Sequence, residues 1–349
     1  MGKLPLTTQT LYAELVEQLV ALEARRSIGS LPGCFTFKTV KGESYVYFQY
    51  SDMHGSPKQV YIGRKTPALD KVIDRFQEER ERNREDIENI QLLCAQLRAG
   101  GILLTDTSSA RVLKVLADSG VFRLSGVLIG TYAFTVLGNV LGVRWKGAAI
   151  KTHDIDIAGG KRMEIALPEI HADIPQSLES LNMGFLPVPP LDPRHPSTSF
   201  KVRGNPLRVD ILTPSRTHMT HKPVTISRFR TAAQPLRFLD FLIERPVQAA
   251  IVDGGGVLVN IPSPSRFALH KLLVAKERDV SMHHKTEKDI IQAVQVLDVL
   301  MDERPGDLPL ACQGLKKRGT VWINKLRAGL SELKGRNPDV YDHLERLLE

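Results

Sequence analysis

Two aspartates alternate with apolar residues in the short stretch HDIDIA, and this stretch restricts the possible folds more than any other part of the chain. In a β-strand, residues i and i+2 point to the same face. Asp154 and Asp156 therefore predict a strand with one acidic and one apolar face. Carboxylates are almost never buried without a partner. Taken alone, the pair would more often mark a solvated edge strand than a site.

The segments around this stretch alternate between strand and helix from Gly100 onward. Helical spacing covers 108–120, 131–142 and 174–182, and strand-like runs cover 123–130, 153–158, 198–204, 207–214 and the hairpin 247–262. Ser108 or Ser109 is the expected cap of the first helix. This order predicts an α+β fold in which helices pack on a mixed sheet.

The two ends of the chain differ from this central part. The pattern predicts a helix over 8–26, a three-stranded meander over 34–40, 44–51 and 58–64, and a long helix over 67–99. The almost fully charged middle of that helix, QEERERNRED, is typical of a solvated face. The chain after Ser263 predicts a helical bundle with two segments after 303. We therefore expect an accessory region (1–99), a core (100–262) and a C-terminal helical domain (263–349).

Composition limits the class of protein. The chain has 349 residues and a net charge of +8, which favours polyanionic partners. Its three cysteines lie far apart and form no CxxC pair, which argues against a disulfide framework and a zinc site. No run is long enough to predict a membrane span, and the first residues lack the apolar core of a secretory signal. We expect a cytoplasmic protein without membrane partners.

Two flanking motifs favour a site at the aspartate pair. In VLIGTYAF a buried strand ends at Gly130, and Thr131 begins a helix, so backbone and hydroxyl donors could meet a phosphate there. In LRVDIL, Asp210 interrupts another apolar strand. Mg²⁺ is typically held by carboxylates together with substrate phosphates. A third carboxylate beside Asp154 and Asp156 would complete such a metal site.

This arrangement resembles the nucleotidyltransferase superfamily that includes DNA polymerase β, poly(A) polymerases and antibiotic nucleotidyltransferases. The superfamily pattern is a strand, Gly-[Gly/Ser] opening a helix, a strand with Asp-x-[Asp/Glu], and a later acidic strand. Gly130-Thr131, Asp154-Ile155-Asp156 and Asp210 follow it in order. The wording GTYAF…THDIDIA…LRVDIL also looks like a little-characterised bacterial family of nucleotidyltransferase-fold proteins, over most of the chain.

Two departures from the pattern affect the substrate side of the site. Threonine replaces the usual second Gly or Ser, which keeps a hydroxyl but adds a methyl group. The interval from Gly130 to Asp154 is 24 residues because GVRWKGAAIK is inserted. Neither departure removes an acidic ligand.

The resemblance implies a two-metal reaction. Asp154 and Asp156 would hold one Mg²⁺ (or Mn²⁺) on an NTP, and both would share a second ion with Asp210. Asp210 would also help to take the acceptor hydroxyl's proton as pyrophosphate is expelled. Relatives place basic residues against the triphosphate about where Lys271 falls, although a solvated helix lysine is an equal alternative. Three basic residues precede Asp154, namely Arg144, Lys146 and Lys151. They either contact the phosphate or the acceptor, or they only add charge to the surface.

The meander contains four of the tyrosines and leaves two interpretations open. Tyr45, Tyr47, Tyr50 and Tyr61 could stack the bases of a single-stranded nucleic acid. We favour the alternative that they form the small core that three strands need.

The resulting hypothesis is an Mg²⁺-dependent, NTP-using nucleotidyltransferase that releases pyrophosphate, with RNA, and tRNA in particular, as the first candidate acceptor. A protein or small-molecule acceptor, in a toxin- or defence-like role, is an alternative. A binding module for nucleotide or nucleic acid without turnover is the rival class. The sequence does not indicate an oligomeric state.

Overall fold

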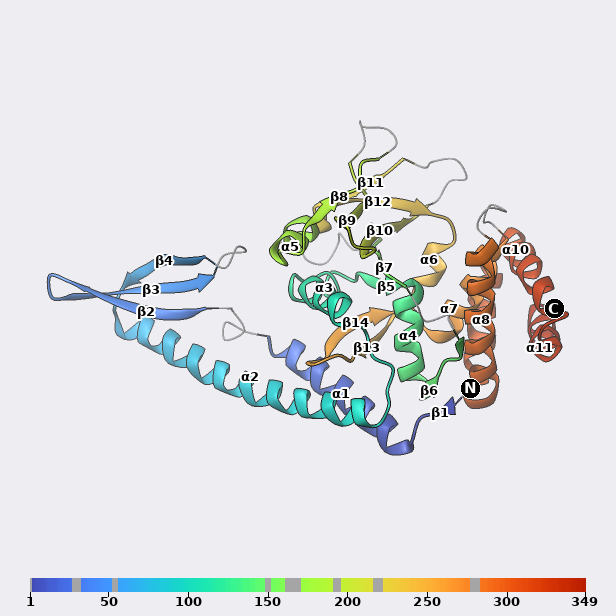
Figure 1. The fold of residues 1–349 in the computed structure, drawn as a ribbon, viewed down its shortest axis with the longest axis horizontal. Coiled ribbons are helices and arrows are strands. Elements are labelled where there is room, and N and C mark those ends of the chain that lie inside the picture. Colours follow the sequence, from blue (N-terminus) through green and yellow to red (C-terminus); the bar gives the residue numbers. More distant parts are fainter. Residues whose placement is uncertain are drawn as a thin grey trace.

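The computed structural model describes residues 2–26, 33–51, 56–147, 152–160, 171–190, 196–215, 222–276 and 283–349. Figure 1 shows a central body around a sheet, an arm at one end of a long helix, and helices at the opposite end. The predicted α+β class is confirmed, because parallel and antiparallel strands share one sheet with helices packed around it.

The central sheet is mixed. Its seven strands are β5 (Val127–Ile129), β7 (Asp154–Ala158), β8 (Phe185–Pro187), β9 (Ser199–Val202), β10 (Arg208–Pro214), β11 (Val224–Ile226) and β12 (Thr231–Leu236). The main path runs β11-β12-β10-β7-β5. Strand β10 is parallel to both β7 and β12, whereas β5 is antiparallel to β7 and β9 is antiparallel to β10.

Helices and a hairpin close the core of this sheet. They are α3 (Thr107–Asp118), α4 (Gly130–Val140), α5 (Ile174–Ser180), α6 (Leu239–Leu242), the strands β13 (Val247–Ile251) and β14 (Val257–Ile261), and α7 (Pro264–Ala275). The side chain that caps α3 is Asp106, which accepts a hydrogen bond from the Ser109 amide at 2.9 Å. The predicted caps Ser108 and Ser109 are therefore wrong, since both lie inside the helix.

The C-terminal helices are α8 (His283–Glu303), α9 (Asp307–Lys316), α10 (Thr320–Leu330) and α11 (Pro338–Leu348). After α8 the described chain forms three α-helices rather than the two predicted segments. One hydrophobic core is continuous from the sheet to these helices, since Ile157, Leu272 and Leu344 belong to the same buried cluster. Packing thus crosses the boundary expected at 262/263.

A second buried cluster attaches the N-terminal helices to the body. Helix α1 (Leu6–Ala24) packs against the last turns of α2 (Pro67–Ala99) and against the β13–β14 hairpin. Leu15, Leu97 and Ala250 are fully buried in this cluster. Tyr12 donates from its hydroxyl to the Ala250 carbonyl at 2.9 Å. Two short strands, β1 (Gly2–Lys3) and β6 (Val143–Arg144), pair nearby.

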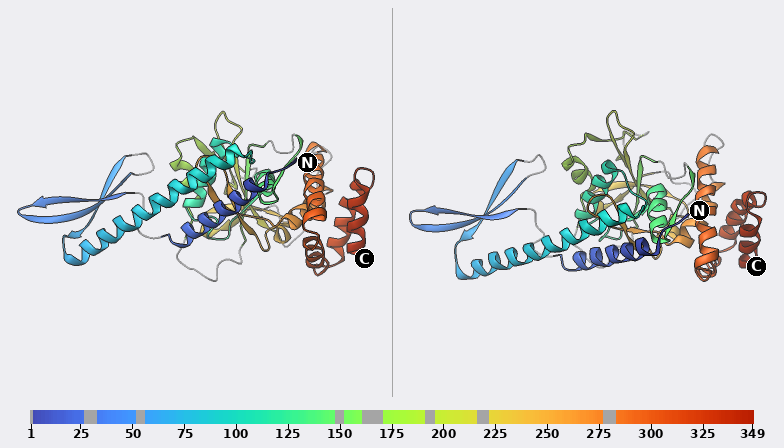
Figure 2. Two further views of the ribbon diagram at one scale, coloured as in Figure 1. Left: turned by 90° about the horizontal axis from the view of Figure 1, so that it is seen from below. Right: turned by 60° about the horizontal axis from the view of Figure 1, so that its bottom comes forward.

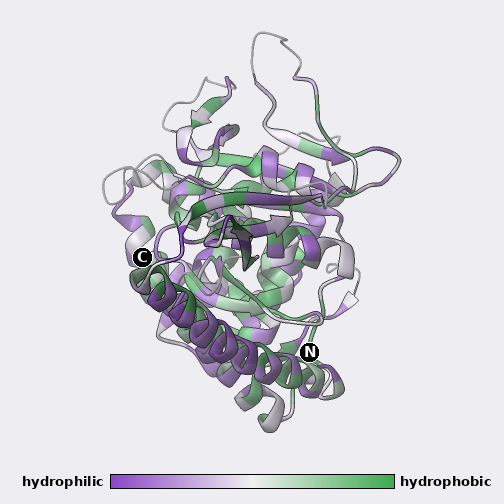
Figure 3. Cartoon of the chain, turned by 90° about the vertical axis from the view of Figure 1, so that its left-hand side faces the viewer, coloured by the Kyte–Doolittle hydropathy of each residue, from purple (hydrophilic) through white to green (hydrophobic). Residues whose placement is uncertain are grey.

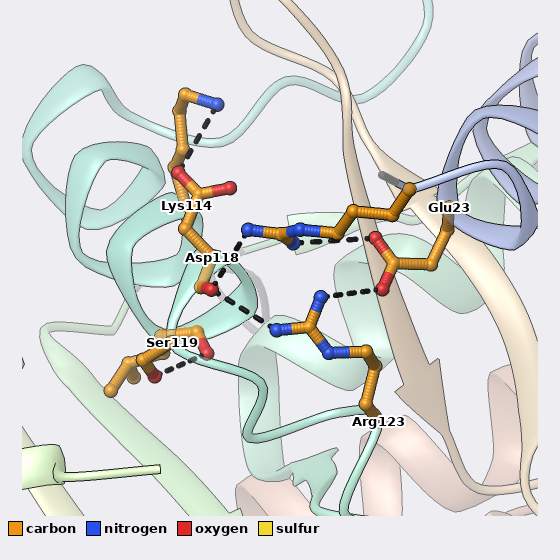
Figure 4. A network of polar contacts seen from close by, with 7 residues as sticks. Glu23, Lys114, Asp118, Ser119 and Arg123 are labelled. Atoms are coloured by element: carbon orange, nitrogen blue, oxygen red, sulfur yellow. Dashed lines mark hydrogen bonds and ion pairs between the residues drawn. The ribbon is translucent and has the colours of Figure 1, made fainter. Parts of the chain in front are cut away.

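Polar contacts also tie the end of α1 to α3 (Figure 4). Arg123 donates to Glu23 at 2.9 Å and to the Asp118 carbonyl at 3.2 Å. Arg26 donates to the same carbonyl at 3.1 Å. The end of α1 is therefore held by two arginines and is part of the body. The division at 99/100 stays a prediction, and these contacts cross it.

The remaining part of α2 extends away from the body and carries the arm, as both views in Figure 2 show. The arm is the meander of β2 (Cys34–Val40), β3 (Glu43–Ser51) and β4 (Pro57–Arg64). Ion pairs such as Arg75–Glu79 at 2.8 Å line the exposed helix, and Figure 3 shows the long helix as mostly hydrophilic. The predicted solvated face is confirmed.

The arm has its own small core on the side of α2. Phe35, Phe48 and Phe76 meet edge-to-face with ring centroids 5.1–5.9 Å apart, and Val46 is fully buried. The prediction that the tyrosines form this core is wrong. Phenylalanine and valine side chains fill it, and Tyr61 is 55% exposed.

No helix in the described part of the chain is both long and apolar enough to span a membrane.

Candidate active site

The two acidic strands lie next to each other in the sheet. In the parallel pairing of β7 with β10, Asp156 is the register partner of Asp210, and Asp154 is the partner of Arg208. The alternate residues Ile155, Ile157 and others on both strands are fully buried. The apolar sides of both strands therefore face the core, and the three aspartates share the opposite face, as the strand pattern predicts.

Asp156 lies at the centre of this acidic face. Burial is the main cause that raises the pKa of its carboxyl to about 7, the charges of Asp210 and Asp154 act in the same direction, and Lys271 and Lys285 oppose the shift. A carboxylate that is desolvated beside like charges resists ionisation. The face therefore has an electrostatic environment that a bound cation would stabilise.

Asp210 is held by two donors on the same oxygen. The Arg208 Nε donates to Oδ1 at 2.7 Å, and the Ser199 hydroxyl donates to the same atom. Arg208 also donates to the Ser199 Oγ at 2.8 Å. These contacts fix the orientation of a side chain that is only 18% exposed.

Gly130 lies directly against the acidic face. It begins α4 with a φ of +68°, and a Cβ atom at this position would overlap the Oδ2 of Asp156. Its neighbour Ile129 is the register partner of Asp156 on β5. Thr131 follows in the first turn and is 8% exposed. The structure thus brings the predicted glycine and threonine to the aspartates, and only glycine fits beside Asp156.

Lys271 lies on α7 and is not a solvated lysine. Its side chain is 11% exposed and pairs with Asp289 of α8 at 2.6 Å. The Nζ atom also lies 5.3 Å from the Phe267 ring centroid. The charge of Lys271 lowers the pKa of Asp156, so this lysine lies near enough to the acidic face to act on it.

Two further lysines come from the start of α8, in the segment KTEKD. Lys285 is exposed, and its charge also lowers the pKa of Asp156. Burial and the charge of Lys271 lower the pKa of Lys288, whereas Asp154 and Asp156 raise it. The pattern KTEKD favours a helical cap at a domain junction over a site, so neither lysine is predicted from it as a site residue. Their spacing of three residues puts them on one helix face, and that was the available signal.

The basic residues before Asp154 have other roles where the structure describes them. Arg144 donates to the Gly101 carbonyl at 2.8 Å. The Lys146 amide and carbonyl are both bonded to Gln295, at 2.7 and 3.2 Å. Arg144 thus supports the chain locally, and Gln295 anchors the Lys146 backbone to α8. Lys151 lies outside the described residues.

The acidic face partly meets the requirements of a metal site. Its carboxylate oxygens are the ligands that Mg²⁺ prefers, and the crowding of Asp156 by Asp210 is typical of a site that takes a cation. However, no three His, Cys, Asp or Glu side chains in the described ranges are positioned to hold one ion together. Asp154 is the exposed member. The Asp156–Asp210 pair therefore fits a metal, and the full three-ligand set stays a prediction.

A pocket of about 300 Å³ adjoins the start of β7. Its lining includes Asp106, Tyr132 and His153, the residue before Asp154. The Tyr132 hydroxyl lies 2.5 Å from the Ser109 Oγ and donates to Asp106 at 3.1 Å. Burial raises the pKa of Tyr132, so this hydroxyl stays protonated at neutral pH. The pocket offers hydrogen-bonding groups beside the acidic face.

The structure has a mixed sheet with paired aspartates on neighbouring strands, next to a glycine that opens a helix. This is the arrangement that the sequence predicts for a nucleotidyltransferase. A nucleotidyltransferase family model matches residues 107–315, which is more than half of the chain. The protein belongs to this family and is an enzyme of the nucleotidyltransferase type. No match is found among curated proteins or among solved structures.

Proposed function

We propose that the protein transfers a nucleoside monophosphate from an NTP to an acceptor hydroxyl and releases pyrophosphate, in a reaction that requires Mg²⁺ or Mn²⁺. The observation that carries this proposal is the direct pairing of Asp156 with Asp210 on parallel strands beside Gly130. In the reaction, the acceptor oxygen bonds to the α-phosphorus, and the bond from that phosphorus to the bridging oxygen of the leaving pyrophosphate breaks.

The carboxylates would bind the divalent cations, with Asp156 and Asp210 as the central ligands and Asp154 as the exposed third. Two ions, when bound, would stabilise the attacking and leaving oxygens. Asp210 would accept the acceptor hydroxyl's proton or direct it to solvent. Its Oδ1 already accepts from Arg208 and Ser199, and these donors orient it for that role.

The lysines of α7 and α8 would bind the triphosphate. Lys271, Lys285 and Lys288 all act on the acidic face electrostatically. The lowered pKa of Lys288 reflects burial and the nearby charge of Lys271. A polyanion between the lysines would relieve that repulsion. Gly130 and Thr131 at the start of α4 would add backbone and hydroxyl donors to a phosphate.

RNA is our first candidate for the acceptor, because the chain carries a net charge of +8 and a basic arm. The decisive experiment incubates wild-type protein and Asp154→Ala with labelled NTPs, Mg²⁺ or Mn²⁺, and total RNA, and examines RNA and protein by mass spectrometry. We expect a mass increase of one or more nucleotides on RNA with wild type alone.

Two other outcomes would change the proposal. Label on protein alone would replace the RNA acceptor with a protein acceptor. If nucleotide or RNA bound tightly but no NTP were consumed with any acceptor, the chain would be a binding module on the same fold.

A further inference from the structure

The outer face of the arm, which we define as the side of the meander turned away from α2, carries a row of tyrosines. Residues opposite each other across three strands share a face. Tyr47 pairs with Thr36 on β2 and with Tyr61 on β4, and Tyr45 pairs with Lys38 and Arg64. The ring centroid of Tyr61 lies 5.5 Å from that of Tyr47 and 6.2 Å from that of Tyr45. The three rings form one aromatic surface.

This surface is not needed to hold the arm together. A small sheet needs one packed face, and Phe35, Phe48 and Phe76 provide it on the side of α2. Tyr61 nevertheless exposes 55% of its surface. Tyr45 and Tyr47 beside it are partly exposed. An aromatic patch that reaches the surface outside the core is typical of a binding surface.

Positive charge and amides surround the tyrosines. The Lys38 Nζ lies 4.6 Å from the Tyr47 ring centroid. Gln59 donates to Gln49 at 3.2 Å on the same face. Within 33–51 and 56–66 the arm has five basic residues and a single acidic one, Glu43, which pairs with Arg64. The charge of the arm therefore complements a polyanion.

The arm also lies well outside the body. Arg25 at the end of α1 pairs with Asp86 of α2 at 3.4 Å. The part of α2 that precedes Asp86 extends roughly 30 Å beyond this point, at the rise of an α-helix. A ligand that contacts both the arm and the acidic face must therefore be long. A nucleotide or a small acceptor does not meet this requirement, whereas a polymer does.

We infer that the outer face of the arm binds single-stranded nucleic acid, with bases stacked on Tyr45, Tyr47 and Tyr61 and with Lys38 near the backbone. Aromatic side chains in a basic setting bind single strands in this way, because every base has a face that can stack. That the bound strand is also the acceptor rests on the proposed function. The binding itself does not.

The test measures binding of the full chain to a fluorescein-labelled oligouridylate by fluorescence anisotropy, without NTP. We expect the double variant Tyr47→Ala/Tyr61→Ala to raise Kd by at least about tenfold. Lys38→Gln should reduce the slope of log K against log salt by about one. A DNA oligonucleotide of matching sequence, and a duplex, are measured in parallel. The duplex should bind more weakly, since its bases are not free to stack.

Phe37→Ala is the matched control. Phe37 is 50% exposed. The Lys65 Nζ lies 5.5 Å from the centroid of its ring, just as the Lys38 Nζ lies over the ring of Tyr47. Phe37 precedes Lys38 in β2, so the two side chains point to opposite faces of the meander. Phe37 therefore lies on the same face as Phe35, which is turned toward α2. We expect Phe37→Ala to keep the wild-type Kd. Circular dichroism checks that all variants are folded.

Cys34 gives a second readout on the same face. It is exposed and pairs with Gln49. Bound oligonucleotide should slow the reaction of Cys34 with a thiol reagent in wild type, and this protection should disappear in the double tyrosine variant.

Several results would overturn the inference. Among them are absence of single-strand binding at low salt, equal weakening by Phe37→Ala, and equal or tighter binding of the duplex. A tyrosine-dependent dimer in light scattering, with unchanged oligonucleotide binding, would assign the face to a second copy of the chain. Tyrosine-dependent capture of an acidic protein, without oligonucleotide binding, would assign it to a protein partner.

The failure of this inference can be told apart from failure of the proposed function. Tyrosine-dependent binding without nucleotide transfer to any acceptor would reject the proposed function alone. Transfer to RNA with unchanged binding by the double tyrosine variant would reject the inference alone.

Discussion

Asp156 on β7 and Asp210 on β10 are direct register partners on adjacent parallel strands, and the charge of Asp210 raises the pKa of Asp156. Their backbones are held in register by the sheet, so both side chains leave neighbouring strands on the same face. The sheet thereby keeps two acidic side chains next to each other. Such crowding is typical of functional sites, where a cation or substrate relieves it.

Replacing either aspartate of this pair with asparagine should remove activity without loss of the fold. We expect Asp156→Asn and Asp210→Asn each to reduce the rate of pyrophosphate release by at least about 1,000-fold, which corresponds to several kcal/mol of transition-state stabilisation. The melting temperature of Asp156→Asn should equal or exceed that of wild type, because a like charge is removed. A near-normal rate in either variant would contradict the assigned role.

Gly130→Ala should disturb the site beyond its effect on stability. Alanine at a positive φ costs about 1–2 kcal/mol, and here the new Cβ also meets the Asp156 carboxylate. Gly184→Ala is the matched control, since Gly184 has a φ of +77° and no atom within 4 Å of its added Cβ. We expect similar losses in chemical denaturation for both variants but loss of turnover for Gly130→Ala alone. Equal turnover in the two variants would show that Asp156 tolerates displacement.

Much of the fold follows from local patterns in the sequence. The predicted ranges 34–40 and 67–99 match β2 and α2 to the residue, because alternation and an N-terminal proline with a threonine cap are strong local signals. Strands β1, β6, β8 and β11 are two or three residues long and show no period. β12 contains Ala, Gln and Pro, which are not typical of strands.

The candidate site was predicted less completely, for a physical reason. Asp154, Asp156, Asp210 and Gly130 stand out because each interrupts or ends an apolar strand. Arg208 could have been found as well, since it lies two residues before Asp210 and shares its face. The contact of Ser199 with Asp210 joins the neighbouring strands β9 and β10. No local sequence pattern indicates which strands pair, so this contact could not be predicted. The residues that form the core of the arm were predicted wrongly. Alternation along the strands defines two faces of the meander but does not show which face packs against α2.

The cysteines should differ sharply in reactivity. Cys34 is exposed, whereas Cys94 and Cys312 are each 1% exposed. Burial raises the pKa of both buried thiols to about 11. The thiolate is the reactive form, so at pH 8 the buried thiols are protonated as well as inaccessible. We expect one fast-reacting thiol with Ellman's reagent in the native protein and three in denaturant. Fast reaction of two or three native thiols would contradict this packing.

Lys285→Gln should weaken NTP binding while leaving the fold intact. Lys285 is exposed at the start of α8, and its charge acts on Asp156. Loss of one charge-assisted contact to a phosphate is worth about tenfold, so KM for NTP should rise by about that factor. Lys276→Gln is the matched control, because Lys276 directly follows α7 and pairs with Glu332 instead. Steady-state kinetics should show a changed KM in Lys285→Gln only, and a parallel change in both variants would point to general surface charge rather than a triphosphate contact.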